Sequence, residues 1–180
     1  FCYKPCKNRH CPKCGAFEKA QWLEAQKKWI LPIHYFHVVF TIDHVFNPLV
    51  AFNQKLLFNL FIDVAARLLK EFGQKYLGGD IGFSLVMHTW GQTMQEHLHI
   101  HFIVTGGALV SSPSGYSWNP ASHKFLFPAL LLSNMFRNHF CFELANLWVD
   151  NKLNTNDGAL DVQDMLQQGL SKNWEVYIQP

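Results

Sequence analysis

The sequence has no apolar run long enough to cross a membrane. Such a span needs about 20 consecutive apolar residues, and the longest apolar stretches here, such as residues 125–132, are much shorter. There is also no N-terminal leader with basic, apolar and small-residue parts, no internal repeat and no low-complexity tract. Together with a length of 180 residues and a hydrophobic content of 49%, these absences predict a globular protein, free of the membrane, that buries one full core.

Charged residues are also few, and they are unevenly distributed. They make up 16% of the chain and leave a net charge of +2, which by itself neither indicates nor excludes a nucleic-acid partner. Residues 1–31, however, hold seven Lys or Arg against two Glu, whereas residues 32–180 hold eight basic and eleven acidic residues. We therefore predict two parts: a segment, 1–31, that contacts phosphate through Lys7, Arg9 and Lys13, and a main domain, 32–180. The alternative is that these basic residues are simply solvated.

Four of the five cysteines lie within the first 14 residues, at Cys2, Cys6, Cys11 and Cys14, with His10 among them. Two cysteines separated by two residues, as Cys11 and Cys14 are, can bind one tetrahedral Zn²⁺ ion, and further thiolates or an imidazole complete the set. Disulfides are the alternative, but no export signal is visible, and two cysteines separated by two residues in cytosolic proteins are more often a metal or redox site. The pattern predicts a small zinc-binding segment ahead of the main domain.

A row of three histidines is the most informative part of the chain. Residues 97–104 read His-Leu-His-Ile-His-Phe-Ile-Val. Successive side chains of a β-strand point to opposite faces, so His97, His99 and His101 share one face and the apolar residues share the other. A single histidine on a strand is usually a satisfied core residue, but burying three imidazoles with no shared partner costs about 1–3 kcal/mol each. The row therefore predicts a metal site or a phosphoryl-transfer site.

The remaining sequence predicts an α+β fold, an antiparallel sheet with helices packed on it. A helix over 16–30 precedes a buried strand over 34–42, and apolar residues at helical spacing predict one long helix over 48–76. Strands over 81–90 and 97–105 most simply form an antiparallel hairpin, which places His88 near the histidine row. The last predicted elements are a loop over 106–123, helices over 128–149 and 159–170, and a strand over 174–178.

Two known families share features of the histidine row. The histidine-triad nucleotide hydrolases are similar in the approach to the row, Gly-Gln-Thr at residues 91–93, and in the alternation of His97, His99 and His101 with apolar residues. That resemblance implies phosphoryl attack by His99 without a metal. Its spacing differs by one residue, and it explains neither the cysteines nor the long segment after the row.

The chain more closely resembles the HUH endonucleases, which are named for two histidines flanking a hydrophobic residue, as His99 and His101 flank Ile100. Within them it is similar to the rolling-circle insertion-sequence transposases, the two-tyrosine group with an N-terminal transposase zinc-binding domain. The resemblance follows the family's order over nearly the whole chain. The matching parts are residues 6–14, 31–41, 88–92, 97–101, 106–107, Trp118 and 125–128.

This resemblance implies an HUH endonuclease domain with a ferredoxin-like sheet that nicks single-stranded DNA at transposon ends and target. Mg²⁺ or Mn²⁺ would be held by His99, His101 and a third ligand, either His97 or His88, and Mn²⁺ is expected to bind more tightly because imidazole suits borderline cations. A tyrosine would attack the phosphate and leave a 5′-phosphotyrosine and a free 3′-OH.

The family's tyrosines lie on a helix after the last strand, and this chain has no two tyrosines four residues apart. We therefore expect the chain to be a fragment whose nucleophile lies beyond Pro180. The resemblance also implies a bacterial cytoplasmic protein and leaves a homo-oligomer open. A third hypothesis is a non-catalytic zinc-ribbon protein, in which residues 1–31 bind DNA and the histidines are structural.

Overall fold

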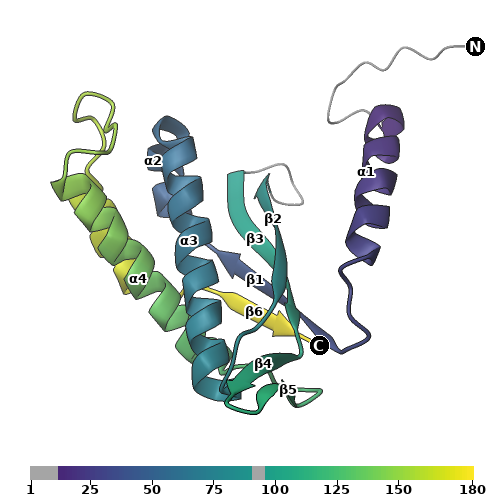
Figure 1. Ribbon diagram of the computed structural model, residues 1–180. Coiled ribbons are helices and arrows are strands. Elements are labelled where there is room, and N and C mark those ends of the chain that lie inside the picture. The colour runs from purple at the N-terminus through teal and green to yellow at the C-terminus, as the bar shows by residue number, and fades with distance from the viewer. Residues whose placement is uncertain (1–11, 91–95) are drawn as a thin grey trace, which may run out of the picture. The chain divides into compact units, whose positions relative to one another are not determined.

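The computed structural model describes residues 12–90 and 96–180, and its chain divides into two compact units, Phe1–Ile33 and His34–Pro180. In the first unit, helix α1 (Pro12–Lys27), purple in Figure 1, confirms the predicted helix. The helix begins earlier than predicted, at a proline. Backbone N–H groups in the first turn of a helix have no partner within the helix, so proline, which lacks this group, loses no hydrogen bond there. The functional role of each unit stays a prediction.

A four-stranded antiparallel sheet forms the centre of the second unit (Figure 1). Its strands are β1 (Tyr35–Thr41), β2 (Phe83–Trp90), β3 (Glu96–Thr105) and β6 (Val176–Gln179). Their order is β2-β3-β1-β6, and every neighbouring pair is antiparallel. The sheet and the predicted hairpin of β2 with β3 are therefore confirmed.

Helices cover one face of this sheet. They are α3 (Gln54–Phe72), α4 (Ala129–Val149) and α5 (Val162–Ser171), and their apolar side chains pack in one core with alternate residues of the strands. Each apolar side chain buried there contributes about 1.5–3 kcal/mol. The α+β prediction is confirmed, and the core-facing residues of β1 and β3 are nearly inaccessible: Phe36, Val38, Phe40, Leu98, Ile100 and Phe102.

The single long helix predicted over residues 48–76 is wrong. The chain instead forms a short 3-10 helix (His44–Phe46), then α2 (Asn47–Phe52), then α3, and a π-helical turn (Gly73–Leu77) that continues α3. Gly78 ends this turn in the left-handed conformation, with φ of 69°, which glycine adopts without strain.

The break between α2 and α3 falls at Asn53, a buried residue. Its amide nitrogen donates to the carbonyl oxygens of Leu49 at 2.9 Å and Asn154 at 2.8 Å, and its side-chain oxygen accepts from the Asn154 N–H at 2.8 Å. Asparagine side chains that bond to backbone in this way compete with continued helix. The apolar spacing over residues 48–76 is helical throughout, but the bonds of Asn53 with Asn154, about a hundred residues away, interrupt the helix.

Residues 106–123, predicted as a loop, form a two-stranded hairpin instead. Strands β4 (Gly107–Ser112) and β5 (Gly115–Pro120) pair along their whole length. Gly115 has φ of 118° in the turn, a conformation open mainly to glycine. At Gly107 an added Cβ would lie 2.5 Å from the Trp118 ring. The glycines that predicted a loop therefore form the turn and the close contact of the hairpin.

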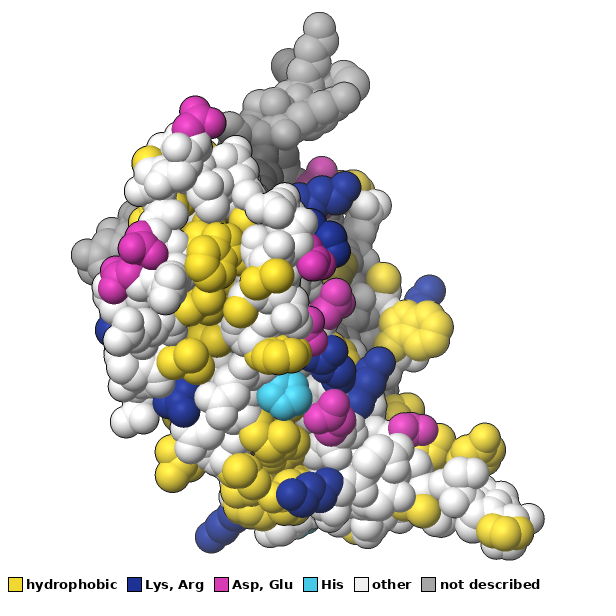
Figure 2. Space-filling model, turned by 90° about the vertical axis from the view of Figure 1, so that its left-hand side faces the viewer, with side chains coloured by type: hydrophobic (Ala, Val, Ile, Leu, Met, Phe, Trp, Pro, Cys, Tyr) yellow, Lys and Arg dark blue, Asp and Glu magenta, His cyan; other side chains and the backbone are white. Residues whose placement is uncertain are grey.

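The outward side of α4 is also apolar. Leu131, Phe142 and Val149 are all exposed, and Figure 2, which views the molecule from the α4 side of Figure 1, shows a band of apolar side chains there. Since Phe136 and Phe140 are buried on the inner side, α4 carries apolar residues on both sides rather than in one stripe. Among the described residues, no helix is long and apolar enough to span a bilayer.

Candidate metal centre

Strand β3 presents the histidine row as the two-residue alternation predicts. Leu98 and Ile100 are 4% and 0% exposed in the core, whereas His97, His99 and His101 are half-buried on the opposite face. Because α3, α4 and α5 pack on the core side, the histidines line the face of the sheet that these helices do not cover. The predicted shared face is confirmed.

Three imidazoles from two strands form a cluster on this face. His88 of β2 lies directly opposite His99 of β3 and diagonal to His101. One ring nitrogen from each of the three lies within 4.8 Å of the others, and the ring centroids are 4.8 to 5.2 Å apart. This spacing lets one ion contact all three nitrogens.

Hydrogen bonds determine which nitrogen of His99 is free. Its Nδ1 lies 2.9 Å from the carbonyl oxygen of His97. Because a carbonyl only accepts, Nδ1 is the protonated nitrogen of the neutral ring, and Nε2 is the one with the lone pair. The Nδ1 of His101 is engaged as well, 2.8 Å from Nε2 of His37 on β1. Metal-binding histidines usually hold their second nitrogen in such a bond, so the cluster fits a metal ion.

Two of the three imidazoles, those of His88 and His101, are held in their neutral form. Burial lowers the pKa of His101 to about 4, and the neighbouring His99, His88 and His37 contribute to the shift. The pKa of His88 is lowered by burial and by His99. A proton on one ring would place a cation in a partly desolvated site beside other imidazoles. Near neutral pH these rings are therefore unprotonated, as metal binding requires.

His97 lies outside the cluster. Its ring contacts that of His44 at a centroid distance of 5.1 Å, and its pKa is lowered by burial, His99 and His44, with Glu175 acting in the opposite sense. The pairing of β2 with β3 shifts register just beyond His88, an irregularity of the kind that re-aims side chains beside functional sites. Of the two residues considered as third ligand, the geometry favours His88.

The predicted zinc and DNA-binding residues of the N-terminal segment lie outside the described part. The structure describes nothing of Cys2, Cys6, Lys7, Arg9, His10 and Cys11, and only the helical backbone of Lys13 and Cys14. The fifth cysteine, Cys141, is buried and free, and burial raises the pKa of its thiol to about 12. A thiol so hard to deprotonate is a poor metal ligand near neutral pH.

His37 and Tyr177 also lie on the histidine face, and neither is among the predicted site residues. His37 contacts His101, as described above. Tyr177 of β6 is paired with Val39 of β1, which is itself paired with His101 of β3, so the exposed tyrosine lies on the same face as His101 with β1 between them. Alternation within β1 could have assigned His37 to the face away from the core, but the sequence does not show that β1 borders β3.

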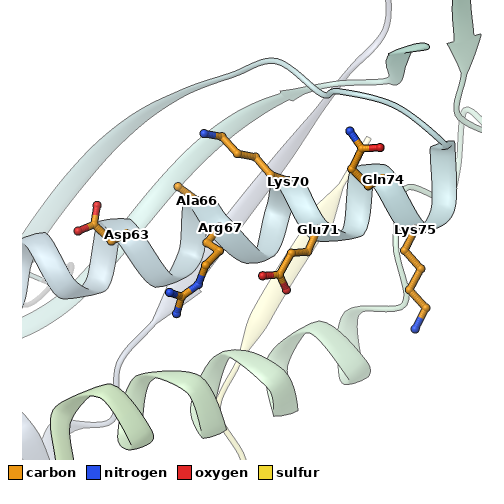
Figure 3. A pocket seen from close by; sticks show the side chains of 7 residues that line it. All are labelled: Asp63, Ala66, Arg67, Lys70, Glu71, Gln74 and Lys75. Carbon is orange, nitrogen blue, oxygen red and sulfur yellow. The ribbon is translucent and has the colours of Figure 1, made fainter. Parts of the chain in front are cut away.

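A separate hollow lies along α3, with a volume of about 750 Å³. Figure 3 shows Arg67 and Glu71 pointing toward α4 and Lys70 pointing away from it, and Arg67 forms an ion pair with Glu143 of α4 at 3.2 Å. This hollow belongs to the helix layer, on the other side of the sheet from the histidines, and its charges are mixed. It is lined by Asp63, Ala66, Arg67, Lys70, Glu71, Gln74 and Lys75.

The family follows from the part of the chain that contains the cluster. A family model described as putative transposase matches residues 82–180, more than half of the chain. The chain belongs to this transposase family. A second model, the transposase zinc-binding domain, matches residues 1–42. Together the two matches confirm the resemblance to insertion-sequence transposases that carry an N-terminal zinc-binding domain.

Two curated relatives of this transposase chain are bacterial. "Putative transposase y4qJ" of Sinorhizobium fredii is 33% identical over 99% of this chain and 46% of its own length. "Transposase for insertion sequence element IS801" of Pseudomonas savastanoi pv. phaseolicola is 34% identical over 58% of this chain and 25% of its own length. The chain thus spans less than half the length of either relative. No solved structure matches it.

The two family matches divide the site residues of the transposase chain. His88, His99 and His101 lie in the part that matches the transposase model, whereas His37 lies in the part that matches the zinc-binding domain model. The latter match supports Zn²⁺ as the metal of the cysteine-rich segment. It also extends into β1, so the second compact unit contains residues from both matches.

We expect His101 of the metal-free chain to stay neutral down to about pH 4, against about 6.5 for an unfolded histidine. Because the folded pKa is the lower one, the unfolded state binds more protons, and stability is lost as the pH falls from about 6.5 toward 4. NMR titration of the imidazole signals measures this pKa. His99→Gln should raise it by removing one neighbouring imidazole, and His139→Gln on α4 should not. An ordinary histidine pKa at His101 would contradict the expectation.

Proposed function

We propose that this chain is the metal-binding part of a transposase that nicks single-stranded DNA, with His88, His99 and His101 holding Mg²⁺ or Mn²⁺. The observation that carries the proposal is the cluster of three imidazoles within 4.8 Å of one another, located in the part of the chain that matches the transposase family. The lowered pKa values of His88 and His101 support it, because they leave these nitrogens free of competing protons.

The donor set favours one of the two cations. All three grouped ligands are imidazoles of intermediate burial, and imidazole suits borderline cations better than the hard Mg²⁺ ion, which prefers oxygen. We therefore infer that Mn²⁺ binds more tightly than Mg²⁺. The three histidines would hold the ion on the face of the sheet that α3, α4 and α5 do not cover, where it could also bind a phosphate oxygen.

A bound cation at this site would neutralise the negative charge that develops on the phosphate oxygens during nicking. The role of the three histidines is to hold their ring nitrogens at fixed positions, since they lie on two paired strands. In the proposed reaction a tyrosine oxygen forms a new ester bond to phosphorus, and the bond from phosphorus to the 3′ oxygen breaks. The products are a 5′-phosphotyrosine and a free 3′-OH, and reversal of the step rejoins a strand.

We expect none of the five tyrosines of this chain to supply that oxygen. Tyr76 packs against Phe72 and Phe127 in the helix layer. Tyr177 is the first tyrosine to test as a nucleophile, because it shares the histidine face. Incubation of the chain with a single-stranded oligonucleotide and Mn²⁺ should leave no covalent adduct, as judged by denaturing gels and mass spectrometry. An adduct mapped to any of the tyrosines, Tyr177 above all, would contradict this expectation.

Calorimetry with Mn²⁺ tests the proposed site. On protein treated with chelator and then given one equivalent of Zn²⁺ for the cysteine-rich segment, so that no excess Zn²⁺ competes at the imidazoles, we expect one Mn²⁺ to bind. We expect the double variant His99→Ala/His101→Ala to bind none because two of its three ligands are gone. His139→Ala, which changes a half-buried histidine of α4, is the matched control and should bind as the wild type does.

The opposite result would redirect the interpretation. If the wild-type chain binds no Mn²⁺ beyond its zinc, the histidines are structural or nucleophilic. Turnover of phosphoramidate nucleotides in EDTA would then favour the histidine-triad hydrolase. DNA binding that survives His99→Ala but is lost in Cys11→Ser would favour the zinc-ribbon protein.

We also propose that the N-terminal segment binds the phosphates of single-stranded DNA through Lys7, Arg9 and Lys13. Replacing all three with Ala should weaken binding and reduce the slope of log affinity against log salt by about 2, since each contact to a single strand contributes about 0.7. Fluorescence anisotropy at several salt concentrations measures both effects. Replacing Lys55, Lys124 and Lys152 of the main domain serves as control, and equal slopes for the two triple variants would exclude a specific role for the segment.

A further inference from the structure

His37 of β1 forms the most direct contact with the cluster from outside it. Its Nε2 lies 2.8 Å from Nδ1 of His101, and the two ring planes are parallel within 7° at a centroid distance of 5.0 Å, a geometry compatible with a hydrogen bond between the two rings. One such bond contains one proton, so one of the two nitrogens donates and the other accepts. Which of them donates decides what the other nitrogen of His101 can do.

We propose that His37 is a positioning residue that accepts the bond from Nδ1–H of His101 and so reserves Nε2 of His101 for the metal. The inference rests on the proposed metal site. A neutral imidazole has one protonated nitrogen, so a proton on Nδ1 leaves the lone pair on Nε2. His99 is held in the same state by the carbonyl oxygen of His97. His37 would thus do for His101 what a backbone carbonyl does for His99.

The surroundings of His37 suit this role. Its neighbours in sequence, Phe36 and Val38, are 1% and 0% exposed, so the backbone of β1 is anchored in the core on both sides of it. On the open face its ladder partners are Ile103 of β3 and Gln179 of β6. Neither of these partners carries a charge. His101 lies diagonal to His37 across the β1–β3 pair, which lets the two side chains meet without distorting either strand.

A positioning role of His37 and a purely structural contact predict different effects of substitutions at this residue. A hydrogen-bond acceptor of similar reach should preserve the orientation and protonation of His101, whereas an apolar side chain of similar volume should not. Partners that orient a metal-binding histidine typically account for about 10-fold to 100-fold in metal affinity. His37→Gln offers an amide oxygen near the position of Nε2, and His37→Leu offers no acceptor.

We would measure Mn²⁺ affinity by calorimetry on the zinc-loaded wild-type chain, His37→Gln, His37→Leu and the control His139→Leu. The proposal expects His37→Leu to bind about 10-fold to 100-fold more weakly and the other two variants to stay close to the wild type. Unchanged affinity in His37→Leu would overturn the role of His37 and leave the metal site standing. An equal loss in His37→Gln and His37→Leu would overturn it too, and would make His37 a ligand itself. No Mn²⁺ binding by the wild type would overturn both proposals.

Proton–nitrogen correlation spectra of the imidazoles give a second readout that does not need the metal. In the metal-free chain, the proton of His101 should reside on Nδ1 in the wild type and in His37→Gln. In His37→Leu the same ring should shift toward protonation at Nε2. A wild-type spectrum with the proton on Nε2 of His101 would overturn the proposal. These spectra also report the fold of each variant, so a loss of affinity through misfolding is recognised directly.

Discussion

The register of β3 within the sheet is the constraint on which the candidate site depends. A slip of one residue would turn Leu98, Ile100 and Phe102 toward solvent and the histidines toward the core. Each of these apolar side chains is almost fully buried and contributes about 1.5–3 kcal/mol, so the slip is strongly disfavoured. The helix layer contributes none of the grouped ligands, yet by burying one face of β3 it determines where the imidazoles of the other face stand.

The same placement makes the site unfavourable for protons and suitable for a cation. Burial disfavours a charge on His88 and on His101, and the neighbouring imidazoles add to this effect. No Asp or Glu occurs anywhere in residues 97–142, so this part of the sequence supplies no carboxylate that would favour protonation. A divalent cation instead uses the lone pairs that the low pKa values preserve. The charges of the hollow along α3 are unrelated to this chemistry, because they lie on the other side of the sheet.

The parts of the site that depend on local pattern could be predicted from the sequence, and the parts that depend on distant partners could not. Two-residue alternation and a short connection were enough to predict one histidine face and a hairpin with His88 beside it. The break at Asn53 was not predicted, because its partner Asn154 lies 101 residues away in the chain. The sequence does not predict His37 as part of the site, because the residues of one strand do not reveal which other strand lies beside it. The residues of the β4–β5 hairpin predict a loop, since glycine, serine and proline are common in both loops and hairpins.

The central claim is that one divalent cation binds where the imidazoles of β2 and β3 converge. The most direct measurement is anomalous diffraction at the manganese edge from crystals of the zinc-restored chain soaked in Mn²⁺. We predict one manganese peak in contact with ring nitrogens of His88, His99 and His101, with Nε2 as the nitrogen supplied by His99 and by His101. The absence of a peak there, or a peak bound through His97 in place of His88, would contradict the structure of the site described above.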